Sequence, residues 1–186
     1  MNLGVDQPRA CVAHKYQRSI GGATSEKEGF VEYLTKPHLT FHGTRRALVP
    51  SIVQHGFLAP GSLHPVTKQS HSVFNGSVYG RGIYSSPQAW YAMMYGDNDE
   101  RTTLSELPGC KLLVCATIMG RTAVMAHEDR WHDRTEPFPG ADSHVNESQH
   151  AYIVFNAAQI LPCYVLHLDY AGREQTQDLW DLLVRS

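Results

Sequence analysis

The sequence has few cysteines, none of them in a closely spaced pair, and it has no long apolar run. Its four cysteines include no Cys-x-x-Cys pair, which argues against a disulfide scaffold or a zinc ribbon. Cys110, Cys115 and Cys163 lie in apolar runs and are expected to be buried free thiols. No segment approaches the roughly 18 apolar residues of a membrane span, and the N-terminus has no signal-peptide pattern. These absences predict an intracellular protein without a membrane partner.

Strong net charge is also missing. The formal charge of -2 gives no long-range positive potential that would attract phosphate backbones, so nucleic-acid binding is not favoured. A hydrophobic share of 42% over 186 residues is enough for a sizeable core. We therefore expect one domain over 1–186, with an N-terminal arm and helix over 1–37, a core over 38–170 and a C-terminal helix over 171–186.

Signals for short elements follow one another in the first half. Ser25-Glu26-Lys27-Glu28 is a capping box that predicts a helix through Leu34. Residues 39–42 alternate apolar and polar side chains, as a strand does. Pro50 suits a first helical turn, and Gly56 suits the left-handed cap that ends a helix.

The next stretch, residues 60–80, is rich in proline, glycine and polar residues and is expected to be a long loop. Gly82-Ile83-Tyr84-Ser85 predicts a short strand. Pro87 then starts a predicted helix, which carries four large side chains: Trp90, Tyr91, Met94 and Tyr95.

The second half contains a nearly continuous apolar run, residues 112–119, which predicts a buried strand. Residues 120–150 are polar and broken by prolines, so we expect an irregular excursion. Residues 152–155 and 160–168 predict two further strands, and a last helix is expected from about Glu174. Because strands and helices do not alternate regularly, the order predicts an α+β fold with antiparallel sheets. The chain has neither a G-x-G-x-x-G fingerprint nor a Walker A sequence.

Three motifs occur in a fixed order along this chain. His42-Gly43-Thr44 ends the first predicted strand, and Tyr79-Gly80-Arg81-Gly82-Ile83-Tyr84 leads into the second. Tyr95 follows Tyr84 by eleven residues, and Tyr152-Ile153-Val154-Phe155 comes late. Each motif alone is weak, since a tyrosine in a strand usually belongs to the core. Together they resemble the catalytic domain of PARP-type ADP-ribosyltransferases, over roughly residues 38–170.

The resemblance implies two small antiparallel sheets around an NAD cleft with helices on the flanks. It also implies NAD as substrate, no metal, and a protein acceptor for ADP-ribose. His42 would bond the ribose, Gly43 would hold the carboxamide, and Tyr84 and Tyr95 would sandwich the nicotinamide ring. Thr44 and Ser85 would complete the NAD-binding residues.

Two positions depart from the family pattern. Ala92 lies where the family often has a serine that bonds the carboxamide. Ala151 lies where the family often has its catalytic glutamate, so the triad of His42, Tyr84 and position 151 lacks its third member. The alanine is either natural or an engineered replacement, or Glu147 substitutes from a rearranged loop. Along a strand, Glu147 would lie about 13 Å away.

The polar region also offers residues for other chemistry. Its histidines and aspartates could hold a metal, but their spacing is irregular, so solvated loop residues are the expected interpretation; they are His127, His132, His144, His150, Asp129, Asp133 and Asp142. Three arginines could meet the adenosine phosphates and are more simply surface charges: Arg121, Arg130 and Arg134.

The resemblance implies transfer of single ADP-ribose units to a protein, or hydrolysis of NAD, with activity reduced or absent because of Ala151. The main alternative is an inactive module that binds NAD or ADP-ribose in a scaffold role. An RNA 2′-phosphate transferase is disfavoured because it needs an arginine cluster, and a purely structural domain is disfavoured by the pocket motifs. Within the family, the strand Val114-Cys115-Ala116-Thr117 and the proline- and glycine-rich excursion after it resemble PARP-like domains of filamentous fungi, some of which adjoin a ubiquitin-conjugating domain.

Overall fold

The computed structural model of the chain describes residues 24–68, 77–96, 110–129 and 131–168. The predicted arm and the predicted C-terminal helix lie outside these ranges, as do residues 69–76 of the expected loop and Arg130. The side chains of Ser25, Glu28 and Cys110 also lie outside the description, so the capping box and the state of Cys110 stay predictions.

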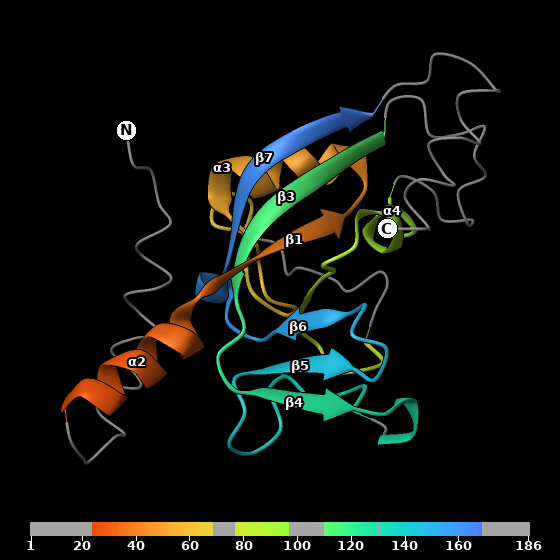
Figure 1. The fold of residues 1–186 in the computed structure, drawn as a ribbon. Coiled ribbons are helices and arrows are strands. Elements are labelled where there is room, and N and C mark those ends of the chain that lie inside the picture. Colours follow the sequence, from red (N-terminus) through yellow and green to blue (C-terminus); the bar gives the residue numbers. More distant parts are fainter. Residues whose placement is uncertain (1–23, 69–76, 97–109, 130, 169–186) are drawn as a thin grey trace, which may run out of the picture.

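Two sheets form the centre of the described structure (Figure 1). Among the described residues, the first has three antiparallel strands in the order β1-β3-β7, and the second has four in the order β2-β6-β5-β4. Their bounds are β1 Pro37–Gly43, β2 Ile83–Ser85, β3 Cys110–Ile118, β4 Thr122–Met125, β5 Ser143–Asn146, β6 Tyr152–Val154 and β7 Ile160–Leu168.

Three α-helices border these sheets in the described ranges: α2 Thr24–Thr35, α3 Val49–His55 and α4 Ala89–Met93. Short 3₁₀ helices occupy Arg46–Leu48, His127–Asp129 and Ala157–Gln159. The α+β class and the strands predicted at residues 39–42, 82–85, 112–119, 152–155 and 160–168 are confirmed. No helix in the described ranges is long and apolar enough to cross a membrane.

The hydrophobic core joins the two sheets. Leu113 and Cys115 of β3 pack with Ile83 of β2 and Val154 of β6, and Val49 at the start of α3 closes the same cluster. Each of these side chains is at most 5% exposed. Burying this much apolar surface is the main favourable term in folding, and here it fixes β2 and β6 against the first sheet.

A direct backbone contact also connects the sheets. Phe41 of β1 and Ser86, just past β2, exchange two hydrogen bonds with N···O distances of 2.7 and 2.8 Å. Because Phe41 precedes His42 and Ser86 follows Tyr84 by two residues, this bridge brings the first two sequence motifs together.

Several expectations need correction. The excursion over 120–150 is not irregular throughout, since it contains β4 and β5, which pair in parallel. The second sheet is therefore mixed rather than antiparallel. The helix after Pro87 is only five residues long and ends at Met93, so Met94 and Tyr95 lie in the following turn.

The expectation that Cys163 is buried was wrong. The residue is exposed because the register of β3 against β7 shifts at this point. Val114 pairs with Tyr164 and Cys115 pairs with Pro162, which leaves Cys163 as the extra, exposed residue of a bulge. Cys115 is a buried free thiol as expected, and burial raises its pKa to about 12.

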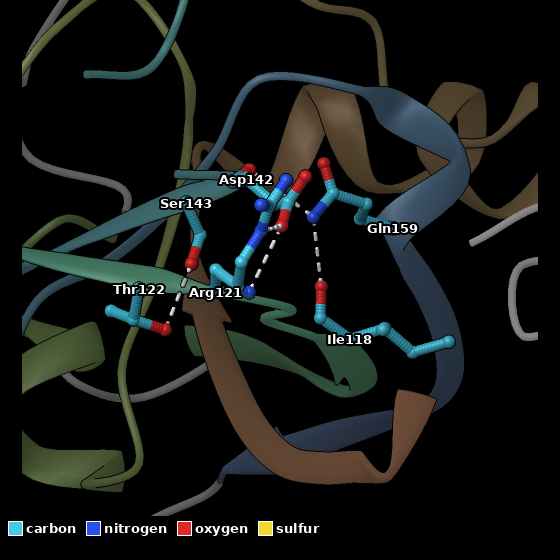
Figure 2. Close-up of polar contacts among 6 residues, drawn as sticks. All are labelled: Ile118, Arg121, Thr122, Asp142, Ser143 and Gln159. Carbon is cyan, nitrogen blue, oxygen red and sulfur yellow. Dashed lines mark hydrogen bonds and ion pairs between the residues drawn. The ribbon is translucent and has the colours of Figure 1, made fainter. Parts of the chain in front are cut away.

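A polar joint connects the end of β3 to the second sheet (Figure 2). The Gln159 side chain donates from Nε2 to the carbonyls of Ile118 and Asp142, at 2.9 and 3.3 Å. Asp142 accepts from the backbone N–H and from Nε of Arg121, at 3.0 and 3.3 Å. Gln159 and Asp142 are 6% and 5% exposed, so the joint lies inside the protein.

We expect Gln159→Leu to lower the free energy of unfolding by about 1–3 kcal/mol, because two buried carbonyls lose their shared donor. Urea denaturation measures this change. Gln54→Leu is the matched control, since Gln54 is exposed on α3 and should change stability by less than about 0.5 kcal/mol. Equal effects of the two substitutions would contradict the role of the joint.

Candidate active site

His42 sits at the end of β1 with its ring held on two sides. Its Nδ1 donates to the Tyr84 carbonyl at 2.6 Å, and the Phe57 ring packs edge-on against it at 4.8 Å between centroids. Since a carbonyl only accepts, the neutral ring carries its proton on Nδ1. The first and second sequence motifs are thus joined through a side chain as well as through the backbone bridge.

Gly43 follows in β1 and lies against the backbone of α4. A Cβ at this position would lie 1.7 Å from the Ala92 carbonyl oxygen, which is impossible without movement. We expected Gly43 to bind a ligand because a glycine lets a ligand approach its backbone closely. The structure adds a second reason, because only glycine allows β1 to pass so close to the turn that leads to Tyr95. Thr44 is half-buried just beyond the strand.

Tyr84 is anchored through its hydroxyl. The oxygen accepts the Tyr79 N–H at 3.0 Å, and the hydroxyl donates to the Gly80 carbonyl at 2.9 Å. Burial raises the pKa of Tyr84 well above its ordinary value, and the hydrogen bond from the Tyr79 N–H only partly offsets this, while the nearby phenols of Tyr79 and Tyr95 add to the rise. The phenol is therefore neutral at physiological pH and presents a fixed ring.

Tyr95 belongs to an aromatic group beside this site. Its ring packs against that of Tyr91 at 5.7 Å, and Tyr91 in turn contacts His150 at 5.6 Å. Trp90 also contacts His150, at 5.4 Å. Trp90 and Tyr91 therefore contact the residue that precedes Ala151, and Tyr95 joins this group through Tyr91.

Ser85 lies in β2 next to Tyr84, and strand alternation turns the two side chains to opposite faces. Ser85 is 6% exposed, and its Oγ has no hydrogen-bond partner among the described residues. A buried hydroxyl without a hydrogen-bond partner is uncommon in proteins, so we expect Ser85 to bond a polar group from outside the chain, such as a ligand or a water molecule.

Ala151 is buried directly before β6, at 2% exposure. Ser85 pairs with Tyr152, so the same register continued by one residue brings Ala151 beside Ser86, which is bridged to Phe41. The backbone alone therefore brings the three triad positions, His42, Tyr84 and Ala151, to adjoining points of two sheets. The methyl group supplies no polar atom there.

Asn146 fixes the backbone around Ala151, and sequence reasoning missed it. Its Oδ1 accepts the N–H groups of His150 and Ala151 at 2.8 and 2.9 Å, and its own N–H donates to the Ala151 carbonyl at 3.2 Å. Glu147, the other carboxylate considered, is exposed in the turn that follows β5. An asparagine before a turn is the only signal that could have drawn attention to this position.

His144 was expected in a solvated loop and is instead fully buried in β5, at 0% exposure. Both ring nitrogens are hydrogen-bonded, to the Tyr79 carbonyl and to the Phe138 N–H. Asp142 is also buried, in the joint described above. Within the described ranges, no group of three or more His, Cys, Asp or Glu side chains is arranged to hold a metal ion.

Burial lowers the pKa of His144 below its ordinary value of 6.5. The unfolded chain protonates this histidine at a higher pH than the folded protein does, so protonation favours unfolding. The contribution of His144 to stability is therefore fully present above about pH 6.5 and is lost as pH falls towards the pKa of the folded state. We expect the melting temperature to fall between pH 7 and pH 5. His144→Gln, which does not titrate, should show a smaller fall, and an equal fall in both proteins would contradict this cause.

A comparison with protein families agrees with the site. The family model described as the poly(ADP-ribose) polymerase catalytic domain matches residues 12–149, which is more than half of the chain. The match includes His42, Tyr84 and Tyr95 and ends before Ala151. A search among curated proteins finds no match. The chain belongs to the family of poly(ADP-ribose) polymerase catalytic domains, ADP-ribosyltransferases that use NAD as substrate.

Proposed function

We propose that this chain binds NAD and transfers a single ADP-ribose unit to a protein side chain, or to water, at a rate kept low by Ala151. The observation that carries the proposal is the position of Ala151. It is buried beside the Phe41–Ser86 bridge, where register brings it next to the residues that flank His42 and Tyr84. The chain keeps the residues assigned to the ribose and the nicotinamide ring, and Ala92 is the other departure from the family pattern.

In this proposal His42 bonds a ribose hydroxyl and the Gly43 backbone holds the carboxamide. The bond between His42 Nδ1 and the Tyr84 carbonyl supports these roles because it fixes the imidazole relative to β2. Tyr84 stacks on the nicotinamide ring, with Tyr95 on the other side. Thr44 follows β1 and Ser85 ends β2, each next to one of these residues in the chain, and in this proposal both contribute polar atoms to the same substrate. The buried Oγ of Ser85, which has no partner among the described residues, supports its role.

The reaction breaks the bond between the nicotinamide nitrogen and C1′ of the ribose. Nicotinamide leaves with the electron pair of that bond, and C1′ develops the positive charge of an oxocarbenium ion. An acceptor atom then bonds to C1′ and gives up its proton to solvent or to a base. A carboxylate near C1′ would stabilise the cation and orient the acceptor, and an alanine does neither.

The missing carboxylate favours single transfer over chain growth, because elongation requires a ribose hydroxyl to be held as the acceptor. Glu147 is exposed, which does not support a replacement from the turn. The same facts support a second candidate function, an NAD- or ADP-ribose-binding module without turnover.

The test is incubation with NAD that carries a label in its adenosine half, with nicotinamide release measured in parallel. The proposal expects slow release and, where a target is present, a discrete labelled band rather than a ladder. His42→Ala should abolish both. A ladder of products would contradict single transfer, whereas tight NAD binding without any release would favour the binding module.

A further inference from the structure

His144 carries two short hydrogen bonds inside the second sheet. Its Nδ1 bonds the Tyr79 carbonyl at 2.7 Å, and its Nε2 bonds the Phe138 N–H at 2.7 Å. A carbonyl only accepts and a backbone N–H only donates, so Nδ1 carries the proton and Nε2 is the acceptor. The ring is thus neutral and in one tautomer, and it joins β5 to two separate loop segments.

The segment on its Nδ1 side is the one that holds Tyr84. Tyr79 receives the His144 bond on its carbonyl and donates its own N–H to the Tyr84 hydroxyl. Gly80 accepts the hydroxyl proton on its carbonyl. The Tyr79–Gly80 dipeptide therefore lies between the imidazole and the phenol. The imidazole bonds the central carbonyl of Tyr79, and the phenol bonds the Tyr79 N–H and the Gly80 carbonyl on either side of it.

Aromatic packing keeps this peptide in place. His144 packs edge-on against Phe155 at 4.7 Å and against Trp131 at 5.7 Å. Gly80 has φ +114°, and a Cβ there would lie 2.8 Å from the Phe155 ring and 3.0 Å from the Trp131 ring. The peptide thus has little room to move while His144 holds its carbonyl.

We propose that His144 is a positioning residue for the NAD site, which fixes the Tyr84 phenol through the Tyr79–Gly80 dipeptide. It acts from inside the sheet and does not touch the substrate. The proposal rests on the proposed function for the role of Tyr84 in stacking on nicotinamide. Its structural part, the dependence of the phenol on His144, holds or fails independently of any substrate.

The first arm of the test needs no ligand. The protein is labelled with 3-fluorotyrosine, and the fluorine signal of Tyr84 is assigned by its loss in Tyr84→Phe. His144→Leu removes both bonds of the imidazole and should shift the Tyr84 signal. His144→Gln keeps one donor and one acceptor and should shift it less.

Two exposed tyrosines serve as internal controls for this arm. Tyr33 and Tyr164 are 74% and 70% exposed, and their fluorine signals should not change in either variant. An unchanged Tyr84 signal in folded His144→Leu protein would overturn the proposal. Equal shifts at Tyr84, Tyr33 and Tyr164 would also overturn it, because they would indicate a general loss of structure.

The second arm is a double-mutant cycle with benzamide, a mimic of nicotinamide, measured by calorimetry. His144→Leu should weaken benzamide binding by about tenfold, the scale of one to two hydrogen bonds. In Tyr84→Phe protein, the same substitution should cause no further loss. Losses that multiply would show that His144 acts independently of Tyr84. If the unaltered chain does not bind benzamide, the proposed function fails, and the fluorine arm alone decides the role of His144.

Discussion

Replacing Ala151 with glutamate raises the rate of nicotinamide release from NAD by about 10²–10³-fold, because a preorganised charge at the reacting centre typically contributes this much. The new carboxylate would face the cation that forms at C1′ of the ribose. Asn146 bonds only the backbone N–H and carbonyl of Ala151 and not its methyl group, so the substitution keeps both hydrogen bonds. Release of labelled nicotinamide under saturating NAD measures the change.

Ala151→Gln is the matched control for this prediction. Glutamine has nearly the same shape as glutamate and carries no charge, so its rate should stay near that of the unaltered chain. Both variants enlarge a residue that is 2% exposed, and their melting temperatures report the cost of fitting the longer side chain. Equal activation by glutamine and glutamate would show that charge is not the missing element.

Gly43→Ala is the second substitution with a large expected effect. The new methyl group would lie 1.7 Å from the Ala92 oxygen and 2.7 Å from its carbonyl carbon, and backbone atoms cannot swing aside as a flexible side chain can. The turn that carries Tyr95 must then separate from β1. We expect a loss of at least about 3 kcal/mol of stability. For a chain of this length, that corresponds to a fall of about 6–12 °C in melting temperature.

Ligand binding should weaken together with stability, because the proposed function assigns Gly43 to the carboxamide and Tyr95 to the nicotinamide ring. Gly29→Ala in α2 is the control, since nothing lies within 4 Å of a Cβ there. Alanine in a helix interior is favoured over glycine by about 0.5–1 kcal/mol, so this variant should be slightly more stable. If Gly43→Ala melted like the unaltered chain, the close approach of β1 and α4 would be wrong.

The elements that were predicted correctly have local signals. Residues 112–119 form an apolar run, and Pro50 with Gly56 bounds a helix, so their structure follows from propensity and burial. His42 and Tyr84 could be paired only through the resemblance, since nothing in their spacing shows that one bonds the carbonyl of the other. The order of the motifs predicted which residues form the site, and the strand register shows that the segments carrying them lie side by side.

What was missed depends on distant partners. Residues 143–146 are polar for the most part, so hydropathy assigned them to a loop, and yet all four are buried. The strand is stable because His144 is bonded by Tyr79 and Phe138, and Asn146 by His150 and Ala151. Buried polar groups need such partners, and a single sequence does not show which residues will meet them. Cys163 was misjudged for a similar reason, because a register shift cannot be read from composition.

Calorimetric titration of the unaltered chain with NAD tests the central claim most directly. We expect NAD to bind at a single site without added metal, and His42→Ala should weaken this binding at least tenfold. Binding is expected even if turnover is too slow to detect, because His42, Tyr84 and Tyr95, the proposed contacts to the ribose and the ring, are present, and the missing carboxylate is expected to act on turnover. No binding of NAD, or equal affinity in His42→Ala, would contradict the assignment of this site.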